Sequence, residues 1–242
     1  WLPEFIENKK RLQKNLKKFD GIYVETNTMK VNMEKLGFSN IYILPNCKEL
    51  KILKENELAY ATSKPFKLCT FSRVMKEKGI EDAVNAVEEI NKKYGETIFT
   101  LDIYGQIDSM QTEWFELLQS RFSKDISYKG LVPFDKSTDI LKNYYALLFP
   151  TRFYTEGIPG TIIDAYASGV PVISAKWESF NDLVNEKIVG YGYTFGNYNE
   201  LIKCLSIAME NSYKWNQMKK NCLVQAEKYS ARYVLNRLIE KL

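Results

Sequence analysis

The sequence predicts an α/β protein built on a parallel sheet with helices on both faces. From residue 66 onward, short apolar runs alternate with stretches whose apolar residues recur at helical spacing. Such alternation is typical of parallel strands joined by helical crossovers. The run Tyr145-Ala-Leu-Leu-Phe149 is apolar throughout, as expected of a strand that is buried on both sides. A chain of 242 residues is long enough for one such domain and part of a second.

The composition is that of an ordinary soluble globular protein, with 45% hydrophobic and 26% charged residues. The net charge of +4 is too small to indicate nucleic-acid binding, and no apolar run reaches the ~18 residues of a membrane span. The chain has no histidine, which argues against a zinc enzyme or a Ser-His-Asp hydrolase. None of its four cysteines forms a C-x-x-C pair, so we expect free thiols in a reducing cytoplasm.

The first part of the chain is expected to form a small αβαβ unit followed by a connector. Its elements are expected in the order helix 3–19, strand 21–25, helix 27–36, strand 41–44 and a charged connector over 48–64. The first helix should turn Phe5, Leu12, Leu16 and Phe19 to one side. Six basic residues and no acid lie between Lys9 and Lys18. We interpret them as a solvated helix face, with a face toward anionic lipid as the alternative.

The rest of the chain is expected to repeat strand–helix units. Strands are expected over 66–71, 98–104, 126–128, 145–149 and 170–174, and helices over 81–94, 110–122, 136–143, 159–168 and much of 199–242. Ligands of open parallel sheets bind beyond the carboxyl ends of the strands. The loops at that edge are 72–78, 105, 130–133 and 151–160, so we expect the functional site there.

One of these loops, which begins at Glu156, carries the most specific pattern. Pro159 suits the first turn of a helix, and Gly160 leaves its backbone open to a ligand. Free amides at the start of that helix, including Thr161, form an anion site. Asp164 follows among apolar neighbours, where a carboxylate needs a partner. Two acids that flank an anion site suggest a nucleotide sugar. The alternative is a turn that caps a buried helix, with Asp164 as a core acid bonded to a neighbouring loop.

A second pattern follows the first strand of the larger unit. Arg73 and Lys78 lie in one strand-to-helix loop, so both side chains can reach the same pocket. Arginine grips phosphate oxygens with two donors, and lysine supplies a point charge. The alternative is a pair of exposed cations in a charged loop.

Residues 66–230 resemble the C-terminal, donor-binding domain of retaining glycosyltransferases of family 4, which have the GT-B fold. The matching motifs are Ser72-Arg73 with Lys78-Gly79, Gly105, Tyr128-Lys-Gly-Leu-Val132, Pro150-Thr151 with Glu156 and Asp164, and Ala165-Tyr-Ala-Ser-Gly-Val-Pro-Val172. The sequence departs from the family pattern at Asp164, where the family has Glu, whose side chain is one methylene longer.

The resemblance implies a Rossmann-like donor domain and a remnant of a second domain. Residues 1–46 would end the N-terminal, acceptor-side domain, 47–64 would be the interdomain linker, 65–230 the nucleotide-sugar-binding domain and 231–242 a C-terminal helix that crosses back. Most of the acceptor domain would lie outside this chain, so we expect the chain alone to be inactive.

The implied activity of the intact protein is transfer of a hexosyl or other glycosyl group from a nucleotide diphosphate to an acceptor hydroxyl with retention. A UDP-, GDP- or ADP-sugar would be the donor, without a metal or other cofactor. A saccharide or lipid-linked saccharide of bacterial cell-surface polysaccharide synthesis would be the acceptor. The protein would work in the cytoplasm, with peripheral contact to the inner face of the membrane through the missing domain as an option.

The resemblance also assigns roles to residues. Arg73, Lys78 and Glu156 are the expected catalytic residues, with the two cations on the phosphates and Glu156 on sugar hydroxyls. The expected donor-binding residues are Gly105, Leu131, Val132, Gly157, Ile158, Pro159, Gly160, Thr161 and Asp164. Asp164 would hold the ribose, and backbone near Gly105, Leu131 and Val132 the base. For Leu131 and Val132, plain core packing is an equal alternative.

Two other functions remain open from the sequence. A non-hydrolysing nucleotide-sugar epimerase shares the fold but would rely on acids and histidines, which fits a histidine-free chain less well. A non-catalytic nucleotide-binding module is compatible with the change at Asp164.

Overall fold

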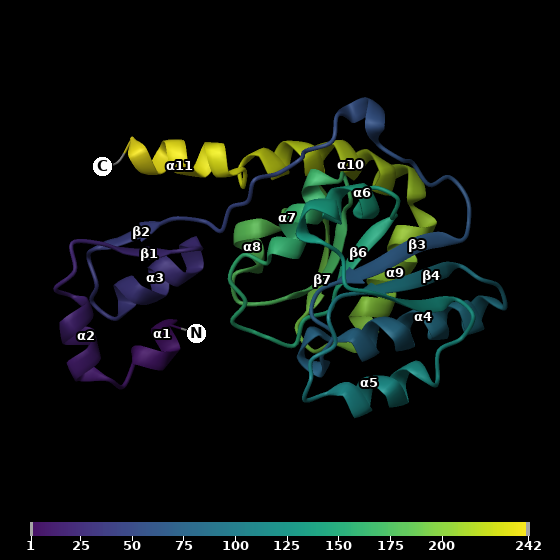
Figure 1. Cartoon of the computed structure of the whole chain (residues 1–242), viewed down its shortest axis with the longest axis horizontal. Coiled ribbons are helices and arrows are strands. Elements are labelled where there is room, and N and C mark those ends of the chain that lie inside the picture. Colours follow the sequence, from purple (N-terminus) through teal and green to yellow (C-terminus); the bar gives the residue numbers. More distant parts are fainter. Residues whose placement is uncertain (1, 241–242) are drawn as a thin grey trace.

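The structure, a computed structural model, describes residues 2–240 and contains two separate parallel sheets (Figure 1). The smaller sheet pairs β1 (Ile22–Val24) with β2 (Ile41–Ile43). The larger one has six strands in the order β5-β4-β3-β6-β7-β8. Its strands are β3 Phe66–Phe71, β4 Phe99–Tyr104, β5 Ile126–Gly130, β6 Ala146–Phe149, β7 Val172–Lys176 and β8 Gly190–Thr194. The predicted parallel α/β fold is confirmed.

In the larger unit, the helices follow the predicted order closely. The helices of both units have the following bounds. They are α1 Leu2–Ile6, α2 Lys10–Leu16, α3 Asn27–Lys35, α4 Ile80–Tyr94, α5 Thr112–Gln119, α6 Ser137–Leu141, α7 Gly160–Ala167, α8 Phe180–Leu183, α9 Tyr198–Glu210, α10 Ser212–Glu227 and α11 Ala231–Ile239. Short 3-10 turns occupy 55–57, 76–78 and 134–136. The part of the predicted crossing helix at 241–242 lies outside the described residues.

The single helix predicted over 3–19 is wrong, because the chain turns between α1 and α2. The buried amide of Gln13 donates to the carbonyls of Ile6 and Glu7, at 2.8 and 2.7 Å, and so satisfies the end of α1. The turn allows Ile6 to join Val24, Met33, Phe38 and Ile41 in a small core. Phe5 and Phe19, which were predicted on one side of that helix with Leu12 and Leu16, are 51% and 60% exposed.

Each face of the large sheet has its own core. Successive residues of a strand point to opposite faces, so Leu68 and Leu148 pack with α4, α5 and α9, whereas Cys69 and Leu147 pack with α6, α7 and α8. Helix α10 contributes to both cores, because Trp215 lies in the first and Cys222 in the second. The sheet is therefore buried on both sides, as a parallel sheet must be.

Strands β3 and β6 mark the point where the chain reverses its direction across the sheet. From β3 the chain moves outward to β4 and β5, then returns to place β6 on the other side of β3 before continuing to β7 and β8. A crevice forms at such a point, beyond the carboxyl ends of the two strands. Phe71, at the end of β3, and Phe149, at the end of β6, therefore open onto the candidate site.

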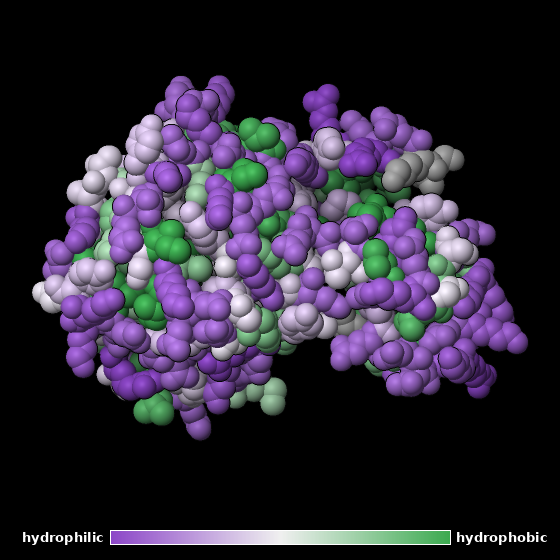
Figure 2. Space-filling model, turned by 180° about the vertical axis from the view of Figure 1, so that it is seen from behind, coloured by the Kyte–Doolittle hydropathy of each residue, from purple (hydrophilic) through white to green (hydrophobic). Residues whose placement is uncertain are grey.

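The two units are joined by more than the linker. Thr26 and Ser179 share a 3.0 Å hydrogen bond between hydroxyls, and Asn32 donates to Glu178 at 2.8 Å. Helix α11 continues from α10 and runs back over the N-terminal unit (Figure 1). Seen from behind, both lobes present a mainly hydrophilic surface with separate apolar patches (Figure 2).

Within residues 2–240, every helix is too short or too polar to cross a membrane.

A buried lysine gives the fold a pH dependence. The Lys219 side chain is 1% exposed and donates to the carbonyls of Tyr144 and Gly169, at 3.1 and 3.4 Å. Burial lowers the pKa of Lys219 from 10.5 to about 8. The unfolded chain therefore binds more protons than the folded one between pH 8 and 10.5, and stability should rise with pH in that window.

The Lys219→Met variant tests this expectation. Each pKa unit corresponds to about 1.4 kcal/mol, so charged Lys219 should lower the free energy of unfolding by about 3 kcal/mol below pH 8. Urea denaturation of both proteins over a pH series measures the effect. The free energy of the native protein, minus that of the variant, should increase by that amount between pH 8 and 10.5. A constant difference would contradict the lowered pKa.

Gly105 allows the ends of β3 and β4 to approach closely. Its φ is +136°, and a Cβ built there would lie 1.7 Å from the carbonyl oxygen of Ser72. Gly130 also has a positive φ, +77°, but a Cβ there would meet open space. We expect Gly105→Ala to lower the free energy of unfolding by about 1–3 kcal/mol more than Gly130→Ala, because only the first adds a clash to the conformational strain. Equal losses in chemical denaturation would show that Ser72 moves aside at no cost.

Candidate functional site

A pocket of about 510 Å³ lies beyond the carboxyl ends of β3, β4 and β6. Its walls come from the loops that follow β3, β4, β5 and β6, together with the start of α7 and the linker residue Lys48. The structure brings ten of the twelve predicted site residues to this pocket: Arg73, Lys78, Gly105, Leu131, Val132, Glu156, Pro159, Gly160, Thr161 and Asp164. The roles of these residues stay predictions.

Lys78 and Glu156 form an ion pair at one wall of the pocket. The Nζ of Lys78 lies 2.5 Å from Oε1 of Glu156, and the same oxygen accepts a 2.9 Å hydrogen bond from Thr151. Both charged side chains are largely buried, at 16% and 14% exposure. The rings of Phe149 and Phe153 lie near the ammonium, 5.6 and 4.9 Å from it. Because both hydrogen bonds use Oε1, the second oxygen of Glu156 is available to a ligand.

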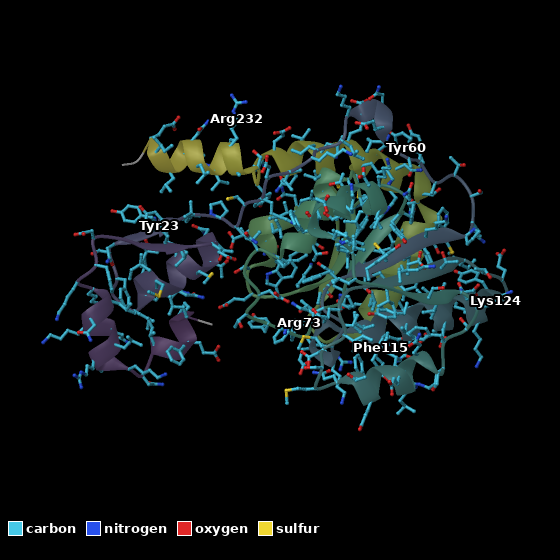
Figure 3. The ribbon with its side chains drawn as sticks, in the orientation of Figure 1. Tyr23, Tyr60, Arg73, Phe115, Lys124 and Arg232 are labelled. Carbon is cyan, nitrogen blue, oxygen red and sulfur yellow. The ribbon has the colours of Figure 1, made fainter. Side chains whose placement is uncertain are left out.

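Arg73 lies at the rim and is only weakly engaged. Its side chain is 63% exposed, and its guanidinium is 3.6 Å from the Asp108 carboxylate. Figure 3 shows Arg73 toward the end of the larger lobe that is nearer the N-terminal unit. An exposed ion pair at this distance contributes little free energy. The guanidinium can therefore turn toward an anion in the pocket.

Helix α7 presents its N-terminus to the pocket. Pro159 precedes the first turn, and the amides of Gly160 and Thr161 have no partner within the helix. Gly160 places no side chain in front of them. The buried hydroxyl Oγ1 of Thr161 has no hydrogen-bond partner among the described residues. The two free amides at this helix start suit an anionic ligand.

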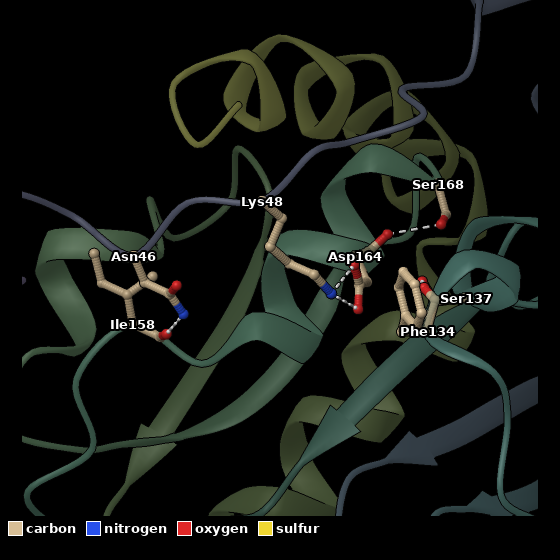
Figure 4. Close-up of polar contacts among 7 residues, drawn as sticks. All are labelled: Asn46, Lys48, Phe134, Ser137, Ile158, Asp164 and Ser168. Atoms are coloured by element: carbon tan, nitrogen blue, oxygen red, sulfur yellow. Dashed lines mark hydrogen bonds and ion pairs between the residues drawn. The ribbon is translucent and has the colours of Figure 1, made fainter. Parts of the chain in front are cut away.

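Asp164 is paired with a lysine that the sequence analysis did not identify. The Lys48 ammonium donates to both carboxylate oxygens at 2.6 Å (Figure 4). The Asp164 side chain is 8% exposed, and burial raises its pKa although Lys48 and Ser137 oppose the shift. Asp164 is therefore a satisfied buried acid and also a lining residue of the pocket. The 116 positions between the partners explain why no local pattern revealed the pair.

The far end of the pocket is formed by exposed apolar side chains. Leu131 is 70% exposed and Phe134 is 89% exposed. Core packing, the alternative considered for Leu131, is therefore wrong, whereas Val132 is partly buried. The Tyr128 hydroxyl donates to the carbonyl of Gly105 at 2.8 Å and fixes this end of β4. Phe134 was not predicted, although it lies directly beyond the predicted ligand loop 130–133.

Gly157 and Ile158 are not lining residues of this pocket; they contact the N-terminal unit. The amide of Ile158 donates to the Glu25 carboxylate at 2.8 Å, and its carbonyl accepts from Asn46 at 2.9 Å. A Cβ on Gly157 would lie 2.1 Å from the Glu25 carboxylate. Their predicted part in donor binding would thus be indirect.

Among residues 2–240, no three His, Cys, Asp or Glu side chains are grouped so that they could hold a metal ion.

Comparison with curated proteins gives two distant relatives. An uncharacterized glycosyltransferase of Haemophilus influenzae is 23% identical over 205 residues, which cover 84% of this chain and 55% of the relative. The GtfA subunit of a UDP-N-acetylglucosamine–peptide N-acetylglucosaminyltransferase of Streptococcus agalactiae is 34% identical over 112 residues, or 46% of this chain and 20% of the relative.

Solved structures share the fold at low sequence identity. Sucrose-phosphate synthase of Thermosynechococcus elongatus aligns with a TM-score of 0.77 at 14% identity, over 95% of this chain and 60% of that one. The complex of Anabaena HepE with UDP gives 0.76 at 15%, over 92% and 63%. Pneumococcal O-GlcNAc transferase GtfA in complex with UDP and GlcNAc gives 0.71 at 23%, over 95% and 46%. The chain thus spans less than two thirds of each of these relatives.

The large sheet and its helices correspond to the C-terminal Rossmann-like half of a GT-B glycosyltransferase. Residues 65–211, which contain that sheet and most of the pocket, match the family described as Glycosyl transferases group 1. This chain belongs to the group 1 family of glycosyl transferases.

Proposed function

We propose that the protein carrying this chain is a retaining glycosyltransferase of family 4 that moves a sugar from a nucleotide diphosphate to an acceptor hydroxyl. The observation that carries the proposal is one pocket in which an exposed arginine, the free amides of α7 and two buried acids face the same space. Residues 65–230 are the proposed donor domain, 1–46 the end of the acceptor-side domain, 47–64 the linker and 231–242 the crossing helix. We propose that this chain binds the donor and that sugar transfer requires the intact protein.

A UDP-sugar is the donor that the relatives favour. The pneumococcal GtfA structure contains UDP and GlcNAc, and an Anabaena HepE structure contains UDP and glucose. A saccharide of the cell surface is the proposed acceptor, because the related folds include a lipopolysaccharide outer core galactosyltransferase, WaaB. We place the reaction in the cytoplasm.

The difficult step in such a transfer is departure of the diphosphate. Negative charge grows on the phosphate as the bond to the sugar breaks, and fixed positive groups aimed at that charge lower the barrier. Arg73, Lys78 and the amides of Gly160 and Thr161 are proposed for this role, which would replace a metal ion. Glu156, held by Lys78, would use its second oxygen to accept from a sugar hydroxyl.

A second candidate, a nucleotide-binding module without transferase activity, is favoured by one observation. Both acids of the pocket are already paired with lysines, Glu156 with Lys78 and Asp164 with Lys48. A site in which the two acids serve only to hold these lysines would bind the nucleotide without acting on the sugar.

Calorimetric titration of the 242-residue chain with UDP, GDP and ADP tests donor binding. The titrations are run first with a chelator and then with magnesium. We expect one diphosphate, UDP, to bind without metal, because the pocket supplies its own positive groups. A folded chain that binds none of the three, in either condition, would contradict a donor site within this chain.

Substitutions in the intact protein test the catalytic assignment. Arg73→Ala and Lys78→Ala should each lower turnover by about one to three orders of magnitude, the scale expected when one charge-stabilising donor is lost. Lys76→Ala is the matched control, because Lys76 is in the same loop but is not a lining residue of the pocket. Near-normal sugar transfer by both pocket variants would overturn the assignment.

A further inference from the structure

The contact between Lys48 and Asp164 changes what each residue can offer to a donor. Both carboxylate oxygens accept from the same ammonium at 2.6 Å. An ammonium has three N–H groups, so one remains after these two hydrogen bonds. The Lys48 side chain is 31% exposed, whereas Asp164 is 8% exposed. Of the two, the lysine is therefore the more accessible group to a molecule in the pocket.

The backbone of Lys48 is fixed, so the position of its side chain is not accidental. Its amide donates to the carbonyl of Tyr229 at 3.1 Å, and its carbonyl accepts from Ala231 at 2.8 Å. These two bonds hold the linker against the junction of α10 and α11. The side chain then passes the start of α7, where its Cδ lies 3.9 Å from the place of a Cβ on Gly160.

We propose that Lys48 donates a hydrogen bond to a ribose hydroxyl of the donor nucleotide, and that Asp164 is the positioning residue that holds its ammonium. The assignment rests on the proposed function. Aspartate is one methylene shorter than glutamate, and both of its oxygens already accept a hydrogen bond from Lys48. The Lys48 ammonium, which is bound to Asp164, supplies the reach toward the ribose that the shorter acid lacks. Phe134 and Ser137 lie beside Asp164 (Figure 4), and the exposed ring of Phe134 offers a face to the base next to that ribose.

The competing arrangement predicts a different result. Each Asp164 oxygen accepts one hydrogen bond from Lys48 and keeps a second lone pair, so Asp164 could also bind the ribose directly. Removing the lysine would then leave the preference for the ribonucleotide in place. Under the proposed arrangement, removing it loses a charge-assisted hydrogen bond, which corresponds to about a 10- to 100-fold loss of affinity.

The experiment is calorimetric titration in chelator with UDP, GDP and ADP and with the 2′-deoxy and 3′-deoxy forms of each. The native chain should bind its preferred ribonucleotide about 10- to 100-fold more tightly than one of the deoxy forms. Lys48→Met should lose this factor for the ribonucleotide and bind both forms equally. Lys48→Arg should retain part of the discrimination, because it keeps a cationic donor.

Two further variants protect the test against misfolding. Lys48→Met leaves a buried carboxylate without its partner, which is strongly destabilising, so Lys48→Met/Asp164→Asn removes both charges together. It should show the same loss of ribose discrimination as Lys48→Met, because the two residues act as one unit. Lys51→Met is the control, since Lys51 lies in the same linker and pairs with Asp139 outside the pocket, 65% exposed. It should bind like the native chain.

The outcomes distinguish a failure of the role proposed for Lys48 from a failure of the proposed donor site. Lys48 variants that bind more tightly, or that lose affinity equally for ribose and deoxyribose forms, overturn the role of Lys48 and leave the donor site intact. A folded native chain that binds no nucleotide overturns the proposed function and the Lys48 assignment with it.

Discussion

Burial of both faces of one parallel sheet is the constraint on which the rest of the structure depends. It requires apolar residues at nearly every position of the central strands, as in Ala146–Phe149, where all four are buried. The polar groups of the candidate site therefore lie in the loops beyond the ends of the strands. The same constraint determines the path of the tail, because α10 passes from one core to the other. The pocket lies beyond the ends of β3 and β6, where the chain reverses its direction across the sheet.

The charges of the pocket are arranged as two neutralised pairs and one exposed cation. Lys78 with Glu156 and Lys48 with Asp164 each cancel most of their net charge, although each pair fixes the position of its members. The positive charge that no acid of the pocket neutralises therefore lies on Arg73 and at the start of α7. Such a site holds its polar groups in place before a ligand arrives, which reduces the cost of reorganisation during a reaction.

Local patterns were sufficient to predict most of the large unit. Its first five strands and the helices between them have continuous apolar runs or clear helical spacing, and Pro159-Gly160 indicated the start of α7 within one residue. The strand β8, Gly-Tyr-Gly-Tyr-Thr, was not predicted because glycine and exposed positions replace the apolar run. The break between α1 and α2 was missed because the spacing of apolar residues does not reveal the bond of the Gln13 side chain back to α1.

The candidate site was predictable in its parts and not in its pairings. The loops at the carboxyl edge were identified because topology alone brings them together. The contact of Lys48 with Asp164 depends on how the linker passes the start of α7, and no local pattern encodes that path. The same is true of Glu25, whose contact with Ile158 joins two units that are far apart in the sequence. The residues of such long-range polar contacts meet only in the folded chain, so a local sequence pattern does not predict the contacts.

The loop 156–158 is held from both sides, by Glu156 within the pocket and by Glu25 and Asn46 of the N-terminal unit. This has a consequence for protein engineering by domain exchange. A donor unit grafted onto a foreign N-terminal unit would keep its sheet and its pocket walls. It would lose the two contacts that fix Ile158, and with them the path of the segment between Glu156 and Gly160. In chimeras of this family, the loop and the residues at the positions of Glu25 and Asn46 should therefore come from the same parent protein.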